Sequence, residues 1–280
     1  MTETKILMDG LCFNEGPRWH DGRLWFSDMH GPKVYALGLD GKSEVIVEVE
    51  NSPSGLGWLP DGRLLIVSMR DRKILRMDPD GLSVHADLSG LASFHCNDMA
   101  VDAKGRAYVG NFGYDLFTGA DRKPAELILV EPDGEARIVA SDMQFPNGTV
   151  ITPDGKTLIV GESMGACLTA FDIADDGSLS NRRVWAQMEG ALPDGIALDA
   201  EMGIWVASPI SGACLRVVEG GEVTDRVEVE NQAFACALGG PDRKTLFICT
   251  AKDSDPESSK QSRTGRIEGV AVKVPGVGLP

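Results

Sequence analysis

Oxygen-bearing side chains recur at one point of a sequence phrase that is repeated six times. The phrase covers residues 15–28, 54–68, 97–111, 147–162, 194–208 and 235–250, and the residues at this point are Glu15, Ser54, Asn97, Asn147, Asp194 and Ala235. Carboxylate and amide oxygens are the ligands that hard divalent cations such as Ca²⁺, Mg²⁺ and Mn²⁺ prefer. If the fold gathers these positions, their two carboxylates repel each other unless a cation lies between them. The pattern therefore predicts a metal site.

A turn is the alternative explanation for two of these residues. Asn147 and Asp194 each precede a glycine, and Asn-Gly and Asp-Gly are common turn dipeptides. Glu15 fits this explanation poorly, because Glu is a weak turn former and a buried, unpaired carboxylate is unfavourable. Glu15 thus favours the metal site over the turn.

The repeat that carries these residues consists of strands and turns, with a period of about 40–50 residues. Its first copy predicts four strands separated by turn residues, at 16–19, 24–26, 33–37 and 43–49. Four antiparallel strands in each of six repeats predict an all-β fold, a six-bladed β-propeller. The innermost strand of every blade lines the axis of such a ring, so the six repeat-equivalent residues are expected to face one another.

The two ends of the chain are expected to close the ring. A strand at Thr4–Leu7 precedes the first repeat, and the last repeat is completed by residues 265–274. Pairing these segments in one blade removes an exposed sheet edge. No Pro- or Gly-rich linker divides the chain, so we predict a single β-propeller domain over residues 1–280. Long insertions are expected at 112–125 and 251–265.

A second polar position ends the strand that follows each inner strand. Its six members are Asp28, Ser68, Asn111, Glu162, Ser208 and Thr250. Because this strand runs back antiparallel, we expect a second polar ring at the same mouth of the channel. Phe112, Tyr114 and Met164 follow second-ring residues and are candidates for an apolar wall. Trp19 and Trp58 are expected to pack between blades.

Composition narrows the classes of partner and location. The chain has 27 Lys and Arg against 42 Asp and Glu, a net charge of −15, which disfavours nucleic acid and anionic membranes as partners. No apolar run approaches the roughly 18 residues of a membrane span, and residues 1–10 do not resemble a signal peptide. The six cysteines include no CxxC pair, so we expect free thiols and a cytoplasmic location.

Four motifs together resemble a known family. They are EGPRW (15–19), NDMAVDAKGRAYVGN (97–111), FPNG (145–148) and LPDGIALD (192–199). In this order they are similar to the SMP-30/gluconolactonase family of six-bladed propeller lactonases, over nearly the whole chain. The resemblance implies that Glu15, Asn147 and Asp194 bind one divalent cation, Ca²⁺ first, with Zn²⁺, Mn²⁺, Mg²⁺ or Fe²⁺ as alternatives. It also implies that Asn97 helps to hold substrate or a metal-bound water.

His95 departs from the pattern of this family. The family commonly carries Arg two residues before the motif Asn, and this chain has His95 there. Because His lacks the multi-donor fork of Arg, the substrate is expected to differ from a simple aldonolactone. His95 is a candidate for a substrate hydrogen bond or a general base, with a solvent-facing loop residue as the alternative. His30, Asn111, Phe112 and Tyr114 are further candidates for substrate binding.

These residues predict a metal-dependent hydrolase that opens a lactone, a small cyclic ester. The cation would polarise the carbonyl, and Asp194 or His95 would take a proton from the attacking water. Direct attack by Asp194 is a second route. An aryl esterase or phosphotriesterase at the same site and a non-catalytic metal-binding propeller are the alternatives. No nucleotide-binding motif is present, and the sequence predicts no oligomeric state.

Overall fold

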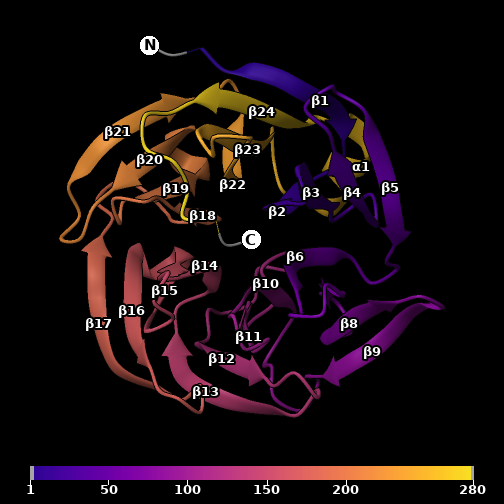
Figure 1. Cartoon of the computed structure of the whole chain (residues 1–280), viewed down its shortest axis with the longest axis vertical. Helices are drawn as coiled ribbons and strands as arrows, with labels where there is room; N and C mark the ends of the chain where they lie inside the picture. Colours follow the sequence, from indigo (N-terminus) through magenta and orange to yellow (C-terminus); the bar gives the residue numbers. More distant parts are fainter. Residues whose placement is uncertain (1–2, 279–280) are drawn as a thin grey trace.

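Six four-stranded antiparallel sheets surround a central axis in the computed structural model, which describes residues 3–278 (Figure 1). This is the predicted six-bladed propeller. Blades 1 to 5 each use four consecutive strands, from the axis outward. Blade 1 contains β2 (Asn14–His20), β3 (Arg23–Asp28), β4 (Lys33–Leu37) and β5 (Ser43–Glu48). Blade 2 contains β6 (Pro53–Trp58), β7 (Leu64–Ser68), β8 (Lys73–Asp78) and β9 (Gly81–Asp87).

The remaining blades follow the same plan. Blade 3 contains β10 (Cys96–Val101), β11 (Ala107–Asn111), β12 (Ala125–Val130) and β13 (Ala136–Met143). Blade 4 contains β14 (Pro146–Ile151), β15 (Thr157–Glu162), β16 (Cys167–Ile173) and β17 (Leu179–Gln187). Blade 5 contains β18 (Ile196–Leu198), β19 (Ile204–Ser208), β20 (Ala213–Val217) and β21 (Val223–Glu228). Blade 6 contains β22 (Gln232–Gly239), β23 (Thr245–Ala251), β24 (Gly265–Ala271) and β1 (Lys5–Leu11).

Blade 6 closes the ring with strands from both ends of the chain, as predicted. Strand β1 is its outermost strand and pairs antiparallel with β24, with Lys5 opposite Gly269 and Leu11 opposite Gly265. The first and last repeats are thereby joined through backbone hydrogen bonds. The closure leaves the ring without an open gap between its first and last blades.

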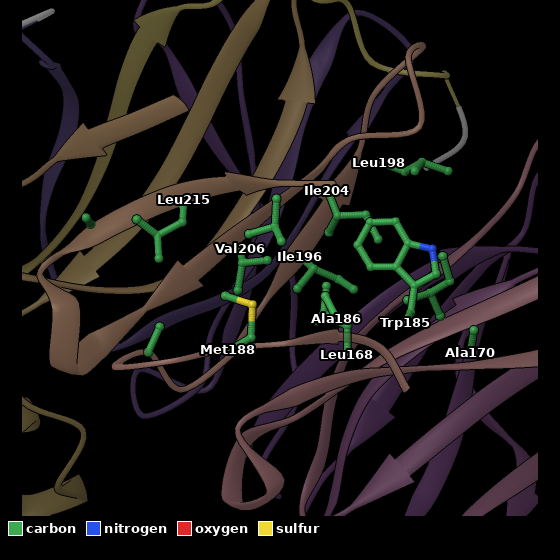
Figure 2. Close-up of a cluster of buried hydrophobic side chains, with 14 residues drawn as sticks. Leu168, Ala170, Trp185, Ala186, Met188, Ile196, Leu198, Ile204, Val206 and Leu215 are labelled. Carbon is green, nitrogen blue, oxygen red and sulfur yellow. The ribbon is translucent and has the colours of Figure 1, made fainter. Parts of the chain in front are cut away.

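Apolar side chains from neighbouring blades pack face to face and form the core. Figure 2 shows one such interface, where Leu168 and Trp185 of blade 4 meet Ile196 and Val206 of blade 5. The aromatic residues Trp19 and Trp58 pack between blades, as predicted. Trp19 stacks on Phe247 of blade 6 with ring centroids 5.5 Å apart, and Trp58 stacks on His20 of blade 1 at 4.0 Å.

Helix is scarce among the described residues, as expected. The only α-helix there, α1 (Pro256–Ser262), lies in the insertion before β24, and Asp255 caps it by accepting hydrogen bonds from the backbone N–H groups of Glu257 and Ser258. Two 3₁₀ turns, η1 (Ser163–Gly165) and η2 (Pro209–Ser211), follow β15 and β19. All six cysteines are free and buried, which confirms the expected thiols. Within residues 3–278, no helix has both the length and the apolar character that a bilayer span requires.

The C-terminal segment lies over the lower end of the channel, where the inner strands finish. The backbone N–H of Val277 donates to Leu198 at 3.3 Å, and that of Gly276 donates to Arg243 at 2.9 Å. We call the opposite end, where the inner strands begin, the upper mouth. The predicted site residues belong to the upper mouth.

Candidate functional site at the upper mouth

A β-bulge interrupts the inner strand at the same point in five of the six blades. The shifts in pairing register fall between Glu15 and Arg18, Pro53 and Leu56, Cys96 and Met99, Pro146 and Thr149, and Ala233 and Ala235. Bulges bend a strand and re-aim its side chains, and they are common next to functional sites. The bulges therefore set the direction of the predicted ring residues.

Glycines beside the ring residues let neighbouring inner strands approach closely. The backbone N–H of Gly148 donates to the carbonyl of Asp194 at 3.1 Å, and that of Gly195 donates to Phe234 at 2.8 Å. A Cβ added to Gly148 would lie 2.4 Å from the backbone nitrogen of Ile196. Asn147 and Gly148 lie within β14, so the alternative that this dipeptide forms a turn is wrong. The glycines instead bring the ring residues together.

We expect Gly148→Ala to destabilise the propeller by about 1–3 kcal/mol, because the added methyl group overpacks a backbone contact. Binding of Ca²⁺ should weaken in the same variant, since the strand that carries Asn147 must shift. Gly90→Ala is the matched control, because a Cβ there meets no atom within 4 Å. Urea unfolding measures the stability of both variants. Equal stability of Gly148→Ala and Gly90→Ala would contradict the close-approach argument.

In blade 6 the ring position belongs to Phe234, one residue earlier than the predicted Ala235. Ala233 lies opposite Thr250 just as Asn14 lies opposite Asp28 in blade 1, so Phe234 corresponds to Glu15. The other five predicted positions are retained. The sixth member of the ring is thus aromatic, and it packs edge-to-face on Phe13 with ring centroids 4.7 Å apart.

The predicted ligands Glu15, Asn147 and Asp194 interact with one another, as the pKa shifts of the two carboxyl groups show. Glu15 and Asn147 are buried, and Asp194 is half-buried with an Oδ1 atom that has no hydrogen-bond partner. Burial raises the pKa of Glu15 well above its usual value, and the charges of Asp194 and Asp98 raise it further. Burial also raises the pKa of Asp194, while the neighbouring Asn147 side chain opposes the rise. A cation between these carboxylates would relieve their repulsion.

This donor set fits a hard divalent cation. It contains two carboxylates and, from Asn147, an amide oxygen, all of the type that Ca²⁺ and Mg²⁺ prefer. The unpartnered Asp194 oxygen is a free ligand atom. Among residues 3–278, no group of three His, Cys, Asp or Glu side chains is arranged to hold a metal ion. The ring therefore depends on Asn147 for its third donor.

Sequence reasoning missed a buried ion pair beside the ring, Arg18 with Asp98. The Arg18 guanidinium donates to Asp98 at 2.7 Å and to the carbonyl of Met99 at 2.7 Å. Asp98 stands where four other repeats carry glycine, and this was the sequence signal for it. Because its Oδ1 is bound by Arg18, we leave Asp98 outside the ligand set.

The residues of the predicted second polar ring form hydrogen bonds with other parts of the chain. Asp28 accepts hydrogen bonds from the backbone of Cys12 and Phe13, and Thr250 donates to Glu268 at 2.8 Å. Asn111 donates to the carbonyl of Glu126 at 3.0 Å. The remaining members, Ser68, Glu162 and Ser208, are also hydrogen-bonded to nearby side chains. These bonds favour a structural role for Asn111 over the predicted substrate contact.

The sequence also matches a known family model. Residues 13–252 match the SMP-30/Gluconolactonase/LRE-like region, which is most of the chain. The chain belongs to this family.

Two sequence relatives and one solved structure are similar to this chain. The chain is 30% identical to regucalcin of Danio rerio over 274 residues, covering 92% of this chain and 91% of that protein. It is 28% identical to 6-deoxy-6-sulfogluconolactonase of Pseudomonas putida over 190 residues, covering 66% of this chain but only 64% of the enzyme, just under two thirds. A solved regucalcin of Agrobacterium tumefaciens, described as a calcium-binding protein, matches with a TM-score of 0.84 at 23% identity, covering 100% of this chain and 97% of that one.

His95, the departure from this family's usual Arg, lies at the upper mouth just before β10. Its ring packs on Phe94 and Phe112, with centroids 4.1 Å and 6.2 Å apart, and its Nδ1 atom is buried without a partner. Burial lowers the pKa of His95, which favours the neutral imidazole. Asn97, two residues on, is buried and makes one long contact of 3.4 Å to the carbonyl of Pro146.

The other predicted substrate residues are buried in an apolar cluster at this mouth. Phe112 stacks on Phe145 with ring centroids 4.5 Å apart, and Tyr114 meets the same ring edge-to-face at 5.9 Å. His30 stacks on Phe13, and its Nε2 atom contacts the carbonyl of Ser254 at 3.2 Å. The structure thus brings these three predicted residues to the same end of the channel as Glu15.

Proposed function

We propose that this family member is a metal-dependent lactonase that opens cyclic esters with water. One observation carries the proposal: Asp194, two residues before β18, has a buried oxygen with no partner and interacts with Glu15 and Asn147, which occupy equivalent bulge positions in β2 and β14. The similarity to a relative named as a gluconolactonase supports the reaction class. A small cyclic ester is therefore the proposed substrate.

Glu15, Asn147 and Asp194 would hold one divalent cation. Their oxygen donors favour Ca²⁺, with Mg²⁺, Mn²⁺, Fe²⁺ and Zn²⁺ as alternatives. When bound, such an ion polarises an ester carbonyl and stabilises the negative charge that develops on its oxygen. Bulges in β2 and β14 would orient Glu15 and Asn147, and the backbone contact between Gly148 and Asp194 would hold Asp194 beside them, which limits the reorganisation that the site requires.

Asp194 and His95 are the two groups that could accept the proton of the attacking water. A carboxylate has two oxygens, so Asp194 would offer one to the cation and the other to the proton of the water, and we assign the proton to it. Burial favours the neutral form of His95, and its Nδ1 is free, so we assign it a hydrogen bond to the substrate. The Asn97 amide, which makes only one long contact, would orient the ester from the other side.

A substrate panel tests the reaction class. We expect the protein, loaded with Ca²⁺, to hydrolyse γ-butyrolactone or D-glucono-1,5-lactone with a higher kcat/KM than p-nitrophenyl acetate or diethyl p-nitrophenyl phosphate. A pH-stat follows acid release from the lactones, and absorbance follows nitrophenol. Preference for the phosphotriester or the aryl ester would point to the alternative hydrolase. Failure to hydrolyse any of the four would favour a non-catalytic metal-binding propeller.

A further inference from the structure

An apolar cap covers the upper mouth of the channel. Its central residues come from five blades and are Phe13, Met69, Phe112, Tyr114, Phe145 and Phe234. Phe13 and Phe145 each lie two residues before a proposed metal ligand, and Phe234 holds a ring position itself. The six residues belong to one cluster of buried, mutually contacting side chains, so the cap spans the mouth. Anything bound to the ring from this side must contact aromatic rings.

Two long insertions complete the cap. The loop after β11 carries Tyr114 and then Phe117, whose ring meets that of His30 in blade 1 at a centroid distance of 6.5 Å. The insertion before β24 reaches the same imidazole through the carbonyl of Ser254. The segments 112–124 and 252–264 therefore meet at His30, although 127 residues of sequence separate them. Both insertions contribute to one site.

Polar atoms without partners lie within this apolar cap. They are the Nδ1 atoms of His30 and His95 and the hydroxyl of Tyr114. His30 is 3% exposed and Tyr114 is 6% exposed, so solvent does not satisfy them. With Asp194 Oδ1, they make up four of the eight buried side-chain atoms that lack a partner among residues 3–278. Buried polar groups are normally hydrogen-bonded, and this concentration of exceptions at one mouth makes these atoms available to bind the polar groups of a ligand.

We propose that the capped site takes a lactone with an apolar substituent, an alkyl chain or a fused aromatic ring, in preference to a polyhydroxylated sugar lactone. This inference rests on the proposed lactonase function. The hydroxyl groups of a sugar lactone each need a partner, and the cap offers three free polar atoms on an aromatic surface. An alkyl or aryl substituent instead buries apolar area against Phe112 and Phe145. The ester of such a substrate supplies acceptors for Tyr114 and His95.

The test compares matched lactones on the Ca²⁺-loaded protein. We expect kcat/KM for γ-decalactone and dihydrocoumarin to exceed that for D-glucono-1,5-lactone by at least tenfold, about the factor that one well-placed apolar group gives. Preference for the sugar lactone would overturn this inference and leave the lactonase function intact. Hydrolysis of none of the three would instead contradict the lactonase function itself.

Variants of the cap separate binding from folding. Tyr114→Phe keeps the ring and removes the free hydroxyl, so KM for dihydrocoumarin should rise at least threefold with the melting temperature retained. Phe112→Ala should lower the ratio of kcat/KM for γ-decalactone over γ-butyrolactone at least tenfold. Val184→Ala is the control, because its side chain is exposed on the outer strand β17. It should leave the KM for dihydrocoumarin and the ratio of kcat/KM values unchanged. An unchanged KM in Tyr114→Phe together with an unchanged ratio in Phe112→Ala would show that the cap is only structural.

Discussion

Replacing Asp194 by asparagine or Glu15 by glutamine is expected to abolish lactone hydrolysis while the propeller stays folded. Each change keeps the volume of the side chain and removes one of the two carboxylates of the ring. A Lewis-acid cation supplies several kcal/mol of transition-state stabilisation, and 1.36 kcal/mol corresponds to a factor of ten in rate. We therefore expect kcat/KM to fall by about 10³-fold or more in either variant. Steady-state kinetics and circular dichroism measure the two expectations separately.

Ser54→Ala is the matched control for these variants. Ser54 holds the ring position of blade 2, and its backbone carbonyl, which the substitution keeps, accepts a hydrogen bond from Ser27 at 2.7 Å. It is not a proposed ligand, so the variant should turn over lactones at a rate close to that of the wild type. Retention of a tenth or more of the wild-type kcat/KM in Asp194→Asn or Glu15→Gln would contradict the proposed ligand set.

Removing the metal ion is expected to lower the stability of the wild type and to leave Glu15→Gln unaffected. Ligand that binds only the folded state stabilises it by about 2.7 kcal/mol at a concentration one hundred times its Kd. In a domain of this size that corresponds to roughly 5–10 °C in Tm. Without the ion, the charge of Asp194 acts unfavourably on the buried carboxylate of Glu15. Chelated Glu15→Gln should therefore melt at the same temperature as chelated wild type, or higher.

Differential scanning calorimetry with EDTA and with excess Ca²⁺ measures these four states. The change in Tm that Glu15→Gln causes in EDTA separates two explanations. Loss of an ordinary buried hydrogen bond would lower the Tm both in EDTA and in Ca²⁺, whereas loss of a metal ligand would lower it only in Ca²⁺. A Tm of the wild type that does not respond to Ca²⁺, Mg²⁺, Mn²⁺, Fe²⁺ or Zn²⁺ would contradict a metal site at the ring.

The repeat in the sequence was sufficient to predict the architecture. Strand and turn residues recur six times, and this repeat is local information that the chain carries without tertiary context. The pairing of β1 with β24 was also predictable, because each would otherwise leave an unpaired sheet edge. Five of the six ring positions followed from the same alignment.

The errors have identifiable physical causes. The hairpin between β22 and β23 leaves five residues between the paired Gly239 and Thr245, against two between His20 and Arg23 in blade 1, so the alignment of the repeats placed the ring position of blade 6 at Ala235 and not at Phe234. The sequence placed Asp28 and Thr250 in a second polar ring, but it did not predict their hydrogen-bond partners, the backbone of Phe13 and the side chain of Glu268. A repeat pattern shows that a residue is polar, but its partner depends on tertiary contacts.

The cap and the Arg18–Asp98 pair required the structure. The pair joins residues 80 positions apart, and the cap joins loops from five blades. The pair joins two inner strands, β2 and β10, through side chains that differ between the repeats, and the cap is completed by insertions whose lengths also differ, so symmetry predicts neither. The sequence did suggest that Phe112 and Tyr114 form an apolar wall, and both lie in the cap.

A crystal structure grown with Ca²⁺, with anomalous diffraction data to locate the ion, tests the central claim most directly. The account predicts one ion at the upper mouth, with oxygen atoms of Glu15, Asn147 and Asp194 at about 2.3–2.6 Å from it. An ion bound elsewhere, or a ring whose carboxylates are hydrogen-bonded to each other with no ion at saturating Ca²⁺, would contradict it.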